Sequence, residues 1–441
     1  MPRQSAHDAY LRKYILFMLF RDYVLDSDSD SDSSESDSSD DENFDLDLTI
    51  LETIRQTRYL GGRSRRQEKA GSLHLAWKYS EHPDDHMRFM KMLRVSPIVF
   101  DFVLACIKDH PVFTNQSNVP QTPVDVQLAV TLYRMGRYGN AASVSDIARN
   151  CGLSVGSVEH FTDRCFTAIE ALHDQFVKPL SSNEKEVEKE WIDGHLGISG
   201  SLWREGYLMY DGTIVVLSSR PGWNGDAYFT RKGNYGLNLQ IGNVPSNLRI
   251  VDYSHGFTGS AHDAAAFEYT GASLHPDVLF QGQEFAWADS AYPISEHVIP
   301  VHRQPASFKP ENKFFDRVVA GLRVRSEHCM GALKGRFQCL RGLRVNINSA
   351  EDHKRACRWI TIAIILHNLV IDAEGKAGGI QFLPNLDEGV QNGGEGVGAG
   401  NIPAGVNIQD EAEVGENKRN QLIVEILVAY GQEFGNEGGN E

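Results

Sequence analysis

Between residues 86 and 176, apolar residues recur at intervals of three and four, the spacing that places them on one face of a helix. Phe100, Val103 and Ile107 show this spacing after Ser96, which precedes a proline and can cap a helix. The pattern therefore predicts an all-α region. Its helices are expected at about 86–94, 97–110, 124–135, 143–150 and 154–172.

The last two of these segments have the form of a helix-turn-helix, with Gly152 at the turn and Ser154 at the start of the second helix. This arrangement favours a module that contacts DNA. The outward side chains of the second helix are not basic, which argues against strong base recognition. They are Ser157, Glu159, His160 and Asp163. A helical hairpin that only packs within the protein is the alternative.

A different pattern begins near residue 205, where short apolar runs rich in β-branched and aromatic residues indicate strands. Strands are expected at 207–217, 237–244, 248–253, 285–288 and 298–301, and helices at 261–269, 314–343 and 351–372. In this order, three antiparallel strands precede a helical crossover to a parallel strand. The predicted fold class is an α/β ribonuclease-H-like catalytic domain over residues 205–372. It contains a mixed five-stranded sheet and follows the all-α helix-turn-helix region over residues 86–176.

The segments outside these two domains are predicted to form terminal extensions and a linker. Residues 1–25 predict an amphipathic helix, and residues 26–48 form a Ser/Asp tract that cannot bury enough apolar surface to fold. Residues 49–85 are expected to be a basic linker that serves as a nuclear-localisation signal or contacts phosphates. Its cations include Arg55, Arg58, Arg63, Arg65, Arg66 and Lys69. Residues 375–416 predict a Gly-rich acidic disordered tail, and residues 417–441 a short helix that could dock a partner.

The net charge of −16 is concentrated in these terminal extensions. Residues 26–48 contain 11 acidic and no basic residues, and residues 375–441 contain 11 acidic and 3 basic residues. The remainder is therefore slightly basic, which permits a nucleic-acid partner.

Cysteine spacing and hydropathy exclude other classes of protein. None of the six cysteines has C-x-x-C spacing, which predicts reduced thiols rather than a zinc site. The apolar runs at 14–20 and 359–366 are too short to span a bilayer, so no membrane association is expected.

Three carboxylates occupy positions suited to metal binding. Asp211 follows the apolar run 207–210 and Asp289 follows 284–288, so both are expected at strand ends that lie side by side. Glu327 lies in the long helix that follows. Such oxygen ligands suit Mg²⁺ or Mn²⁺, and two ions together can activate the attacking group and stabilise the leaving oxygen of a phosphodiester. We therefore predict a two-ion site that acts on nucleic acid.

Cations accompany these acids. Arg323, Glu327, Gly331 and Lys334 share one helix face, where Gly331 leaves room for a DNA backbone and the two cations can hold phosphates. The alternative for Glu327 taken alone is an exposed helical acid. Further DNA contacts are predicted for Arg231, Lys232, Arg325 and Arg336. A solvated surface is the alternative for the first two.

Two further residues have open roles. Asp263 begins a predicted helix, where an acid can interact favourably with the helix dipole or support the metal site as an additional ligand. His367 lies on the apolar face of its helix and is predicted to be a hydrogen-bonded core residue.

An ordered set of short motifs runs through residues 211–368. They are Asp211-Gly-Thr213; Arg231-Lys-Gly233 with Leu237-Asn-Leu-Gln240; Gly259-Ser-Ala-His-Asp263; Asp289-Ser-Ala-Tyr-Pro293; Glu327 with Gly331, Leu333-Lys334 and Arg336-Phe337; and Leu366-His-Asn368. Together they resemble the DDE endonuclease domain of PIF/Harbinger transposases and of the Harbinger-transposase-derived nucleases of animals. The resemblance covers roughly residues 86–372.

The resemblance implies a divalent-metal-dependent DNA endonuclease with Asp211, Asp289 and Glu327 as its catalytic metal ligands. A working transposase of this kind hydrolyses phosphodiester bonds and joins the freed 3′ ends to target DNA. The family often relies on a separate Myb-like protein for DNA recognition. Ile214 departs from the pattern, since the family often has His there, and we do not expect this change to abolish metal binding.

We further expect a homo-oligomer when the protein is active, and a location in the nucleus with the cytoplasm as a second compartment. The main rival hypothesis is a catalytically inactive domesticated transposase that binds DNA or chromatin. A third is a helix-turn-helix regulator that recognises DNA through residues 86–176 alone.

Overall fold

The computed structural model describes residues 6–27, 37–56, 70–115, 118, 120–383 and 408–431. The chain divides into two units, Met1–Lys69 and Ala70–Glu441.

In the first unit, helices α1 (Ala6–Ser27) and α2 (Asp37–Gln56) contact each other. The Tyr14 hydroxyl donates a 2.9 Å hydrogen bond to Asp47, which also pairs with Arg21. A helix thus lies where the N-terminal helix was predicted, and its amphipathic character stays a prediction. The prediction of an unstructured tract over residues 26–48 is wrong from Asp37 onward, because α2 covers that part.

Helix α2 also extends into the predicted basic linker and ends just after Arg55. The remaining predicted cations, Arg58, Arg63, Arg65, Arg66 and Lys69, lie outside the described residues, as do residues 28–36 of the acidic tract.

The second unit begins with α3 (Leu75–Glu81), which lies in the segment predicted to be a linker, so that prediction is wrong here. The next helices lie where the periodicity predicted them: α4 (His86–Leu93), α5 (Pro97–Ile107), α6 (Val124–Met135), α7 (Val144–Cys151) and α8 (Val155–Glu170). A short helix that was not predicted, α9 (His173–Phe176), follows. Ser96, Ser143 and Ser154 each accept a backbone hydrogen bond at a helix start. Gly152 ends α7 at a φ of 69°, a conformation that favours glycine and that turns the chain into α8.

Five strands form one mixed sheet in the order β3-β2-β1-β4-β5. They are β1 (Leu208–Val216), β2 (Gly236–Asn243), β3 (Ile250–Thr258), β4 (Ala286–Ala288) and β5 (Val298–Pro300). The first three are antiparallel to one another, whereas β4 runs parallel to β1 and β5 parallel to β4. This is the sheet that the sequence predicted, and it is consistent with a ribonuclease-H-like domain.

Helices cover both faces of the sheet. One face packs against α14 (Pro310–Arg336) and α15 (Ala350–Glu374), through residues of β1 and β2 such as Val215, Leu237 and Leu239. The other packs against short helices that include α11 (Asp263–Phe267), α12 (Gly271–Leu274) and α13 (Pro276–Leu279). Because strand side chains alternate in direction, neighbouring residues of β1 face different layers.

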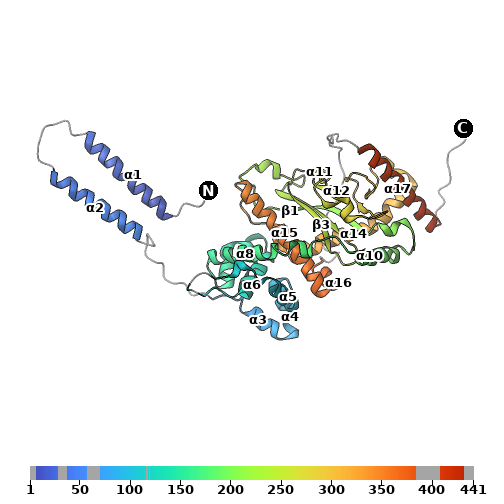
Figure 1. Ribbon diagram of the computed structural model, residues 1–441, viewed down its shortest axis with the longest axis horizontal. Helices are drawn as coiled ribbons and strands as arrows, with labels where there is room; N and C mark the ends of the chain where they lie inside the picture. The colour runs from blue at the N-terminus through green and yellow to red at the C-terminus, as the bar shows by residue number, and fades with distance from the viewer. Residues whose placement is uncertain are drawn as a thin grey trace. The chain divides into compact units, whose positions relative to one another are not determined.

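Helix α15 joins the helical region to the sheet. It contacts α5 and α8 as well as β3 (Figure 1). The ring centre of Trp359 lies 4.8 Å from that of Phe166. Among the described residues, α15 is the helix long and apolar enough to cross a membrane. However, 83% of its apolar window is buried inside the protein, as in a core helix. The helical region and the sheet therefore share one hydrophobic core.

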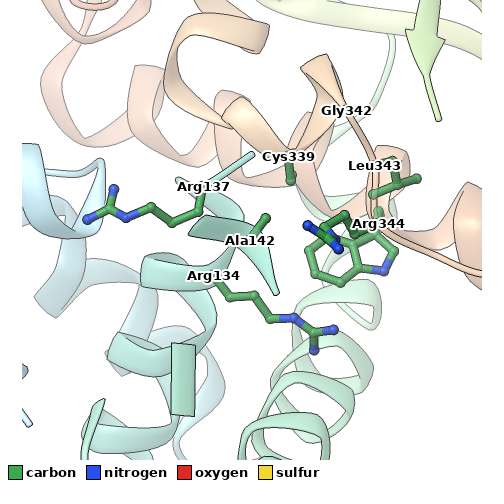
Figure 2. Close-up of a pocket in the computed structure, with 8 residues that line it drawn as sticks. Arg134, Arg137, Ala142, Cys339, Gly342, Leu343 and Arg344 are labelled. Carbon is green, nitrogen blue, oxygen red and sulfur yellow. The ribbon is translucent and has the colours of Figure 1, made fainter. Parts of the chain in front are cut away.

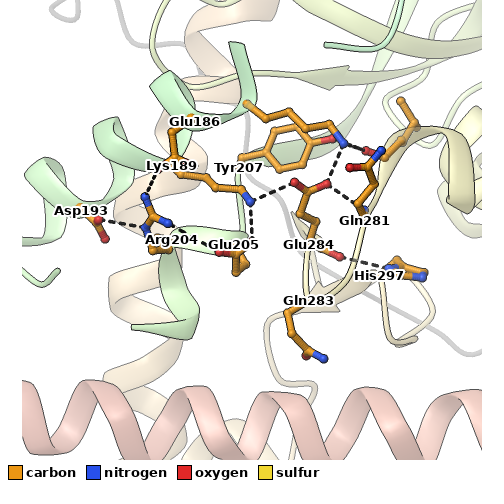
Figure 3. A network of polar contacts seen from close by, with 12 residues as sticks. Glu186, Lys189, Asp193, Arg204, Glu205, Tyr207, Gln281, Gln283, Glu284 and His297 are labelled. Atoms are coloured by element: carbon orange, nitrogen blue, oxygen red, sulfur yellow. Dashed lines mark hydrogen bonds and ion pairs between the residues drawn. The ribbon is translucent and has the colours of Figure 1, made fainter. Parts of the chain in front are cut away.

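The sequence analysis predicted no helix between residues 177 and 204, where α10 (Ser182–Leu196) lies. A capping box between Ser181 and Glu184 begins it. Its Lys185 and Lys189 hold Glu284 at 2.7 and 2.9 Å, at the entry to β4 (Figure 3). Burial raises the pKa of Glu284, but the two ammonium groups outweigh it and leave the pKa below its ordinary value.

At the C-terminal end, α16 (Lys376–Ile380) and α17 (Ile408–Ala429) replace part of the tail that was predicted to be disordered. The α17 helix begins before residue 417, where the sequence placed its start. Its apolar face, predicted to dock a partner, packs on its own domain through Leu422 and Ile426. Trp203 Nε1 donates a 2.9 Å hydrogen bond to the Leu422 carbonyl.

We expect Glu284→Gln to lower the free energy of unfolding by about 3 kcal/mol, because it leaves two buried ammonium groups short of a counter-ion. Urea unfolding followed by circular dichroism measures this change. Asp277→Asn, which alters an exposed acid on α13, should stay within about 0.5 kcal/mol of the unaltered protein. Equal unfolding midpoints for both variants would contradict the role given to Glu284.

Candidate metal centre

The parallel pairing of β1 with β4 brings two aspartates together. Leu208 is paired with Ala286 and Met209 with Trp287. Two residues further along this register, Asp211 aligns with Asp289. The prediction that both acids end their strands is wrong for Asp211, since β1 continues to Val216, whereas Asp289 directly follows β4.

The guanidinium of Arg323, on α14, lies against both aspartates. Its Nη2 atom is 3.6 Å from Asp211 Oδ1, and its Nη1 atom is 3.4 Å from Asp289 Oδ1. The three side chains are 18–30% exposed, so they line a partly open site. A single cation therefore balances two carboxylates that would otherwise repel each other.

Backbone amides hold the same carboxylate oxygens. The Gly212 amide donates to Asp211 Oδ1 at 2.9 Å, and the Ser290 amide donates to Asp289 Oδ1 at 2.7 Å. Each aspartate is thereby oriented by the residue that follows it in the chain.

Asp211 is the more perturbed of the two aspartates. Burial raises the pKa of its carboxyl to about 6, against the opposing effects of Arg323 and the Gly212 amide. The nearby negative charges of Asp289 and Asp263 add to the increase. A carboxylate that is costly to ionise and adjoins another acid is typical of a site that receives a cation.

Glu327 lies one helical turn beyond Arg323 on the same face of α14, and its side chain is exposed. Further along this face, the Lys334 ammonium contacts Thr213 of β1 at 2.6 Å. Glu327 thus lies between two residues of α14 that contact β1. Within the described ranges, however, no group of three His, Cys, Asp or Glu side chains is arranged to hold an ion. The acid pair is assembled, and the predicted third ligand stands apart from it.

Asp263 approaches β1 from the face that α11 covers. A Cβ atom on Gly212 would lie 2.7 Å from its Oδ1 atom, so the glycine is what allows this approach. Asp211, the neighbour of Gly212, points instead towards α14 and Arg323. Asp263 is therefore separated from the aspartate pair by the strand itself, a position that suits support rather than direct metal ligation.

Three residues of this layer form a polar support that the sequence reasoning did not assign. Asn238 and Gln240 donate to Asp263 Oδ1 at 2.9 and 2.8 Å, and the Tyr292 hydroxyl donates to Gln240. Tyr292 is fully buried, and the turn that carries it begins at Asp289. Polar residues at alternate positions of a strand that is buried throughout were the signal that could have identified them.

The comparisons with known proteins agree with this geometry. Residues 210–368 match the family model described as DDE superfamily endonuclease. We refer to this matching part of the chain as the DDE domain. No curated protein and no solved structure matches the chain.

The DDE domain presents Arg231 and Lys232 at the exposed tip of the segment between β1 and β2. The tip is tight, with the Gly233 amide bonded to the Thr230 carbonyl and Gly233 at a φ of 77°. Arg231 lies 2.7 Å from His262, the residue before Asp263. Arg231 thus lies next to the segment that carries Asp263, and contact of either cation with phosphate stays a prediction.

Two predicted DNA contacts donate to backbone carbonyls instead. Arg336 is 1% exposed and donates to the carbonyls of Arg94 and Gly378, so the prediction that it binds DNA is wrong. Arg325 is half-buried and donates to the carbonyls of Pro245 and Ser246. DNA contact by Arg325 stays a prediction.

Lys334 also differs from its predicted role at a phosphate. Its ammonium donates to Thr213 Oγ1 at 2.6 Å and to the Ile214 carbonyl at 2.8 Å. Burial, together with the positive charges of Lys232 and Arg341, lowers its pKa to about 8. The side chain therefore fastens α14 to β1 and fixes the position of the helix that carries Glu327.

His367 is a core residue, as predicted. It is 1% exposed, lies 2.8 Å from the Leu248 carbonyl, and has its pKa lowered by burial to about 4. The next residue, Asn368, bonds both the amide and the carbonyl of Ile250. This pair fastens α15 to the start of β3.

The donor set fits a hard divalent cation. Asp211 and Asp289 supply carboxylate oxygens at a shared position, and that position already attracts the positive charge of Arg323. A cation bound there would take over the neutralising role of the guanidinium. Asp211, Asp289 and, after a side-chain movement, Glu327 are the residues that would hold it.

We expect Asp211→Asn to stabilise the metal-free protein at pH 7.5 by on the order of 1–2 kcal/mol. The folded pKa of about 6 lies above the ordinary 3.8, so the folded state keeps a proton that the unfolded chain releases. Wild-type stability therefore falls as the pH rises from about 4 to about 6.

Chemical denaturation of both proteins across this range checks the prediction. The difference in free energy of unfolding between the variant and wild type should shrink as the pH falls from 6 towards 4. Above pH 6 it should stay constant. A variant that is less stable than wild type at pH 7.5 would contradict the assignment.

Proposed function

We propose that this protein is a divalent-metal-dependent DNA endonuclease of the DDE transposase type. It hydrolyses phosphodiester bonds and, in a mobile element, joins the freed 3′ ends to target DNA. The observation that carries the proposal is the pair of aspartates that share Arg323 at the centre of a DDE domain. The Harbinger-type motifs support placing it in that branch of the superfamily.

When bound, Mg²⁺ or Mn²⁺, as one or two ions, would polarise the phosphoryl oxygens and activate the attacking water. The chain supplies the geometry. Asp211 and Asp289 are held in position by the amides of Gly212 and Ser290. Arg323, once released from the aspartates, is placed to contact the scissile or neighbouring phosphate.

Support for the aspartates comes from both layers of the domain. Lys334 anchors α14 on β1 and so holds in place the helix face that carries both Arg323 and Glu327. On the other face, Asn238 and Gln240 hold Asp263 behind the strand. This rigid backing restricts the movement of β1 while the substrate binds.

The proposal extends to partners and location. We infer that the substrate is DNA, that a Myb-like protein supplies sequence recognition, and that the protein acts in the nucleus as a homo-oligomer. The outward face of α8 supports a separate recognition partner, because its exposed residues include Glu159, His160 and Asp163 and few cations.

A second candidate function is a catalytically inactive, domesticated transposase that binds DNA or chromatin. One observation favours it: in the described part of the chain, Glu327 is not assembled with the two aspartates. The two functions differ in whether metal-dependent cleavage accompanies DNA binding.

We expect Asp289→Asn to reduce single-turnover DNA cleavage in Mg²⁺ or Mn²⁺ by about 100-fold or more, because a metal ligand worth several kcal/mol is lost. Full-length protein is assayed with and without a Myb-like partner, and Asp277→Asn serves as the matched control.

DNA binding in EDTA should be equal for all three proteins, which shows that the variants are folded. If wild type and Asp289→Asn gave the same background cleavage while both bound DNA, the inactive alternative would replace the nuclease.

A further inference from the structure

A pocket lined by arginines lies between the helical region and the DDE domain. Arg134 is on α6, Arg137 follows that helix, and Arg344 comes about 200 residues later, after the short helix η7 (Gln338–Arg341) (Figure 2). Trp359 of α15 closes one side. No acidic residue lines this pocket.

Each arginine is fixed by hydrogen bonds or ring contacts rather than by an ion pair. Arg134 donates to Thr162 at 3.0 Å and lies 4.9 Å from the centre of the Trp359 ring. Arg137 lies 4.2 Å from the ring of Tyr133.

Arg344 is exposed and donates at 2.9 Å to the Gly139 carbonyl, across the boundary between the two regions. Across the part of the chain that the structure describes, none of the three lining arginines forms an ion pair within 4 Å. Stacking and single hydrogen bonds fix a guanidinium in place and keep its other donors available.

Further basic residues lie between the pocket and β1. Burial and the charges of Arg137 and Arg341 lower the pKa of Arg94 to about 10. Arg341 likewise acts on Lys334, whose ammonium contacts Thr213, two residues beyond Asp211. Arg341 therefore interacts electrostatically with both Arg94 and Lys334.

We propose that Arg134, Arg137 and Arg344 bind the phosphodiester backbone of the DNA that flanks the cleavage site. The proposal rests on the proposed function, since it takes duplex DNA as the substrate of the DDE domain. Planar guanidinium groups match phosphate oxygens in pairs, and a polyanion offsets a group of like charges that form no ion pairs.

This site gives the helical region a role other than base recognition. The exposed face of α8 carries Glu159 and Asp163, which also lie close enough to Arg134 to raise its pKa against the effect of burial. A DNA backbone would be repelled by these acids and attracted by Arg137 and Arg344. The helical region therefore positions the flanking DNA through its arginines and leaves sequence reading to other groups.

The test measures how binding of a duplex of about 30 bp, three helical turns, depends on salt. Full-length wild type, the double variant Arg137→Gln/Arg344→Gln and the control Arg88→Gln are compared in EDTA, so that cleavage does not interfere. Arg88 is an exposed arginine of the helical region that already pairs with Asp85.

We expect the double variant to reduce the slope of log affinity against log salt by about 1–2, because two phosphate contacts are lost. The control should match wild type. An unchanged slope in the double variant, or an equal decrease in the control, would overturn the proposal.

Two further measurements distinguish a lost DNA contact from a loss of folding or of catalysis. Arg344→Glu alone, at an exposed position, should lower affinity without changing the thermal unfolding midpoint, whereas unchanged affinity would overturn the proposal. On the long duplex the double variant should cleave with a raised KM and an unchanged kcat.

Other outcomes separate this proposal from its rivals. If all proteins fail to cleave but the salt slope still falls in the double variant, the proposed nuclease function fails and the DNA site stands. If a synthetic peptide of residues 26–48 binds wild type but not the double variant, and the DNA slopes are equal, the pocket takes an acidic segment and the proposal is wrong.

Discussion

The parallel pairing of β1 with β4 is the constraint on which the candidate centre depends. Only two residue pairs make this contact, yet it aligns Asp211 with Asp289, which are far apart in the sequence. Two neighbouring carboxylates repel each other. Arg323, which α14 carries, lies against both and offsets this repulsion. The position of α14 matters in turn, because the same helix carries Glu327.

Much of the surrounding structure serves to hold this arrangement. Strand β4 is short, and the buried network of Lys185, Lys189 and Glu284 fixes the segment that enters it. Ion pairs of this kind contribute little net stability compared with apolar packing, but they are costly to break. Such a network therefore favours one position of β4, which is what a site built from two strands needs.

The sequence predicted the strands well because each combines a short apolar run with clear turn residues at its ends. It misplaced Asp211 at a strand end because an acid in the middle of a strand looks like a boundary. The helix α10 was missed because Lys185 and Glu188, which are charged, occupy buried positions on it. Local patterns cannot indicate that a charged residue will find a buried partner nearly 100 residues away.

The same limit explains why the sequence did not predict the surroundings of the arginines. Arg325 and Arg336 looked like surface cations beside Glu327, but carbonyl groups from distant loops engage them. In contrast, Arg134 and Arg137 lie close together in the sequence, and Arg344 joins them only where the segment after η7 meets the helical region. Asp263 was left open for a similar reason, since only the sheet shows that it approaches β1 from the opposite face.

The central claim is that the aspartate pair receives a divalent cation in place of the Arg323 guanidinium. Anomalous diffraction from crystals of the protein grown with Mn²⁺ tests it most directly. The account predicts an anomalous peak between Asp211 and Asp289, with the Arg323 side chain displaced from both. Crystals that bind Mn²⁺ only elsewhere, with Arg323 still between the two aspartates, would contradict it.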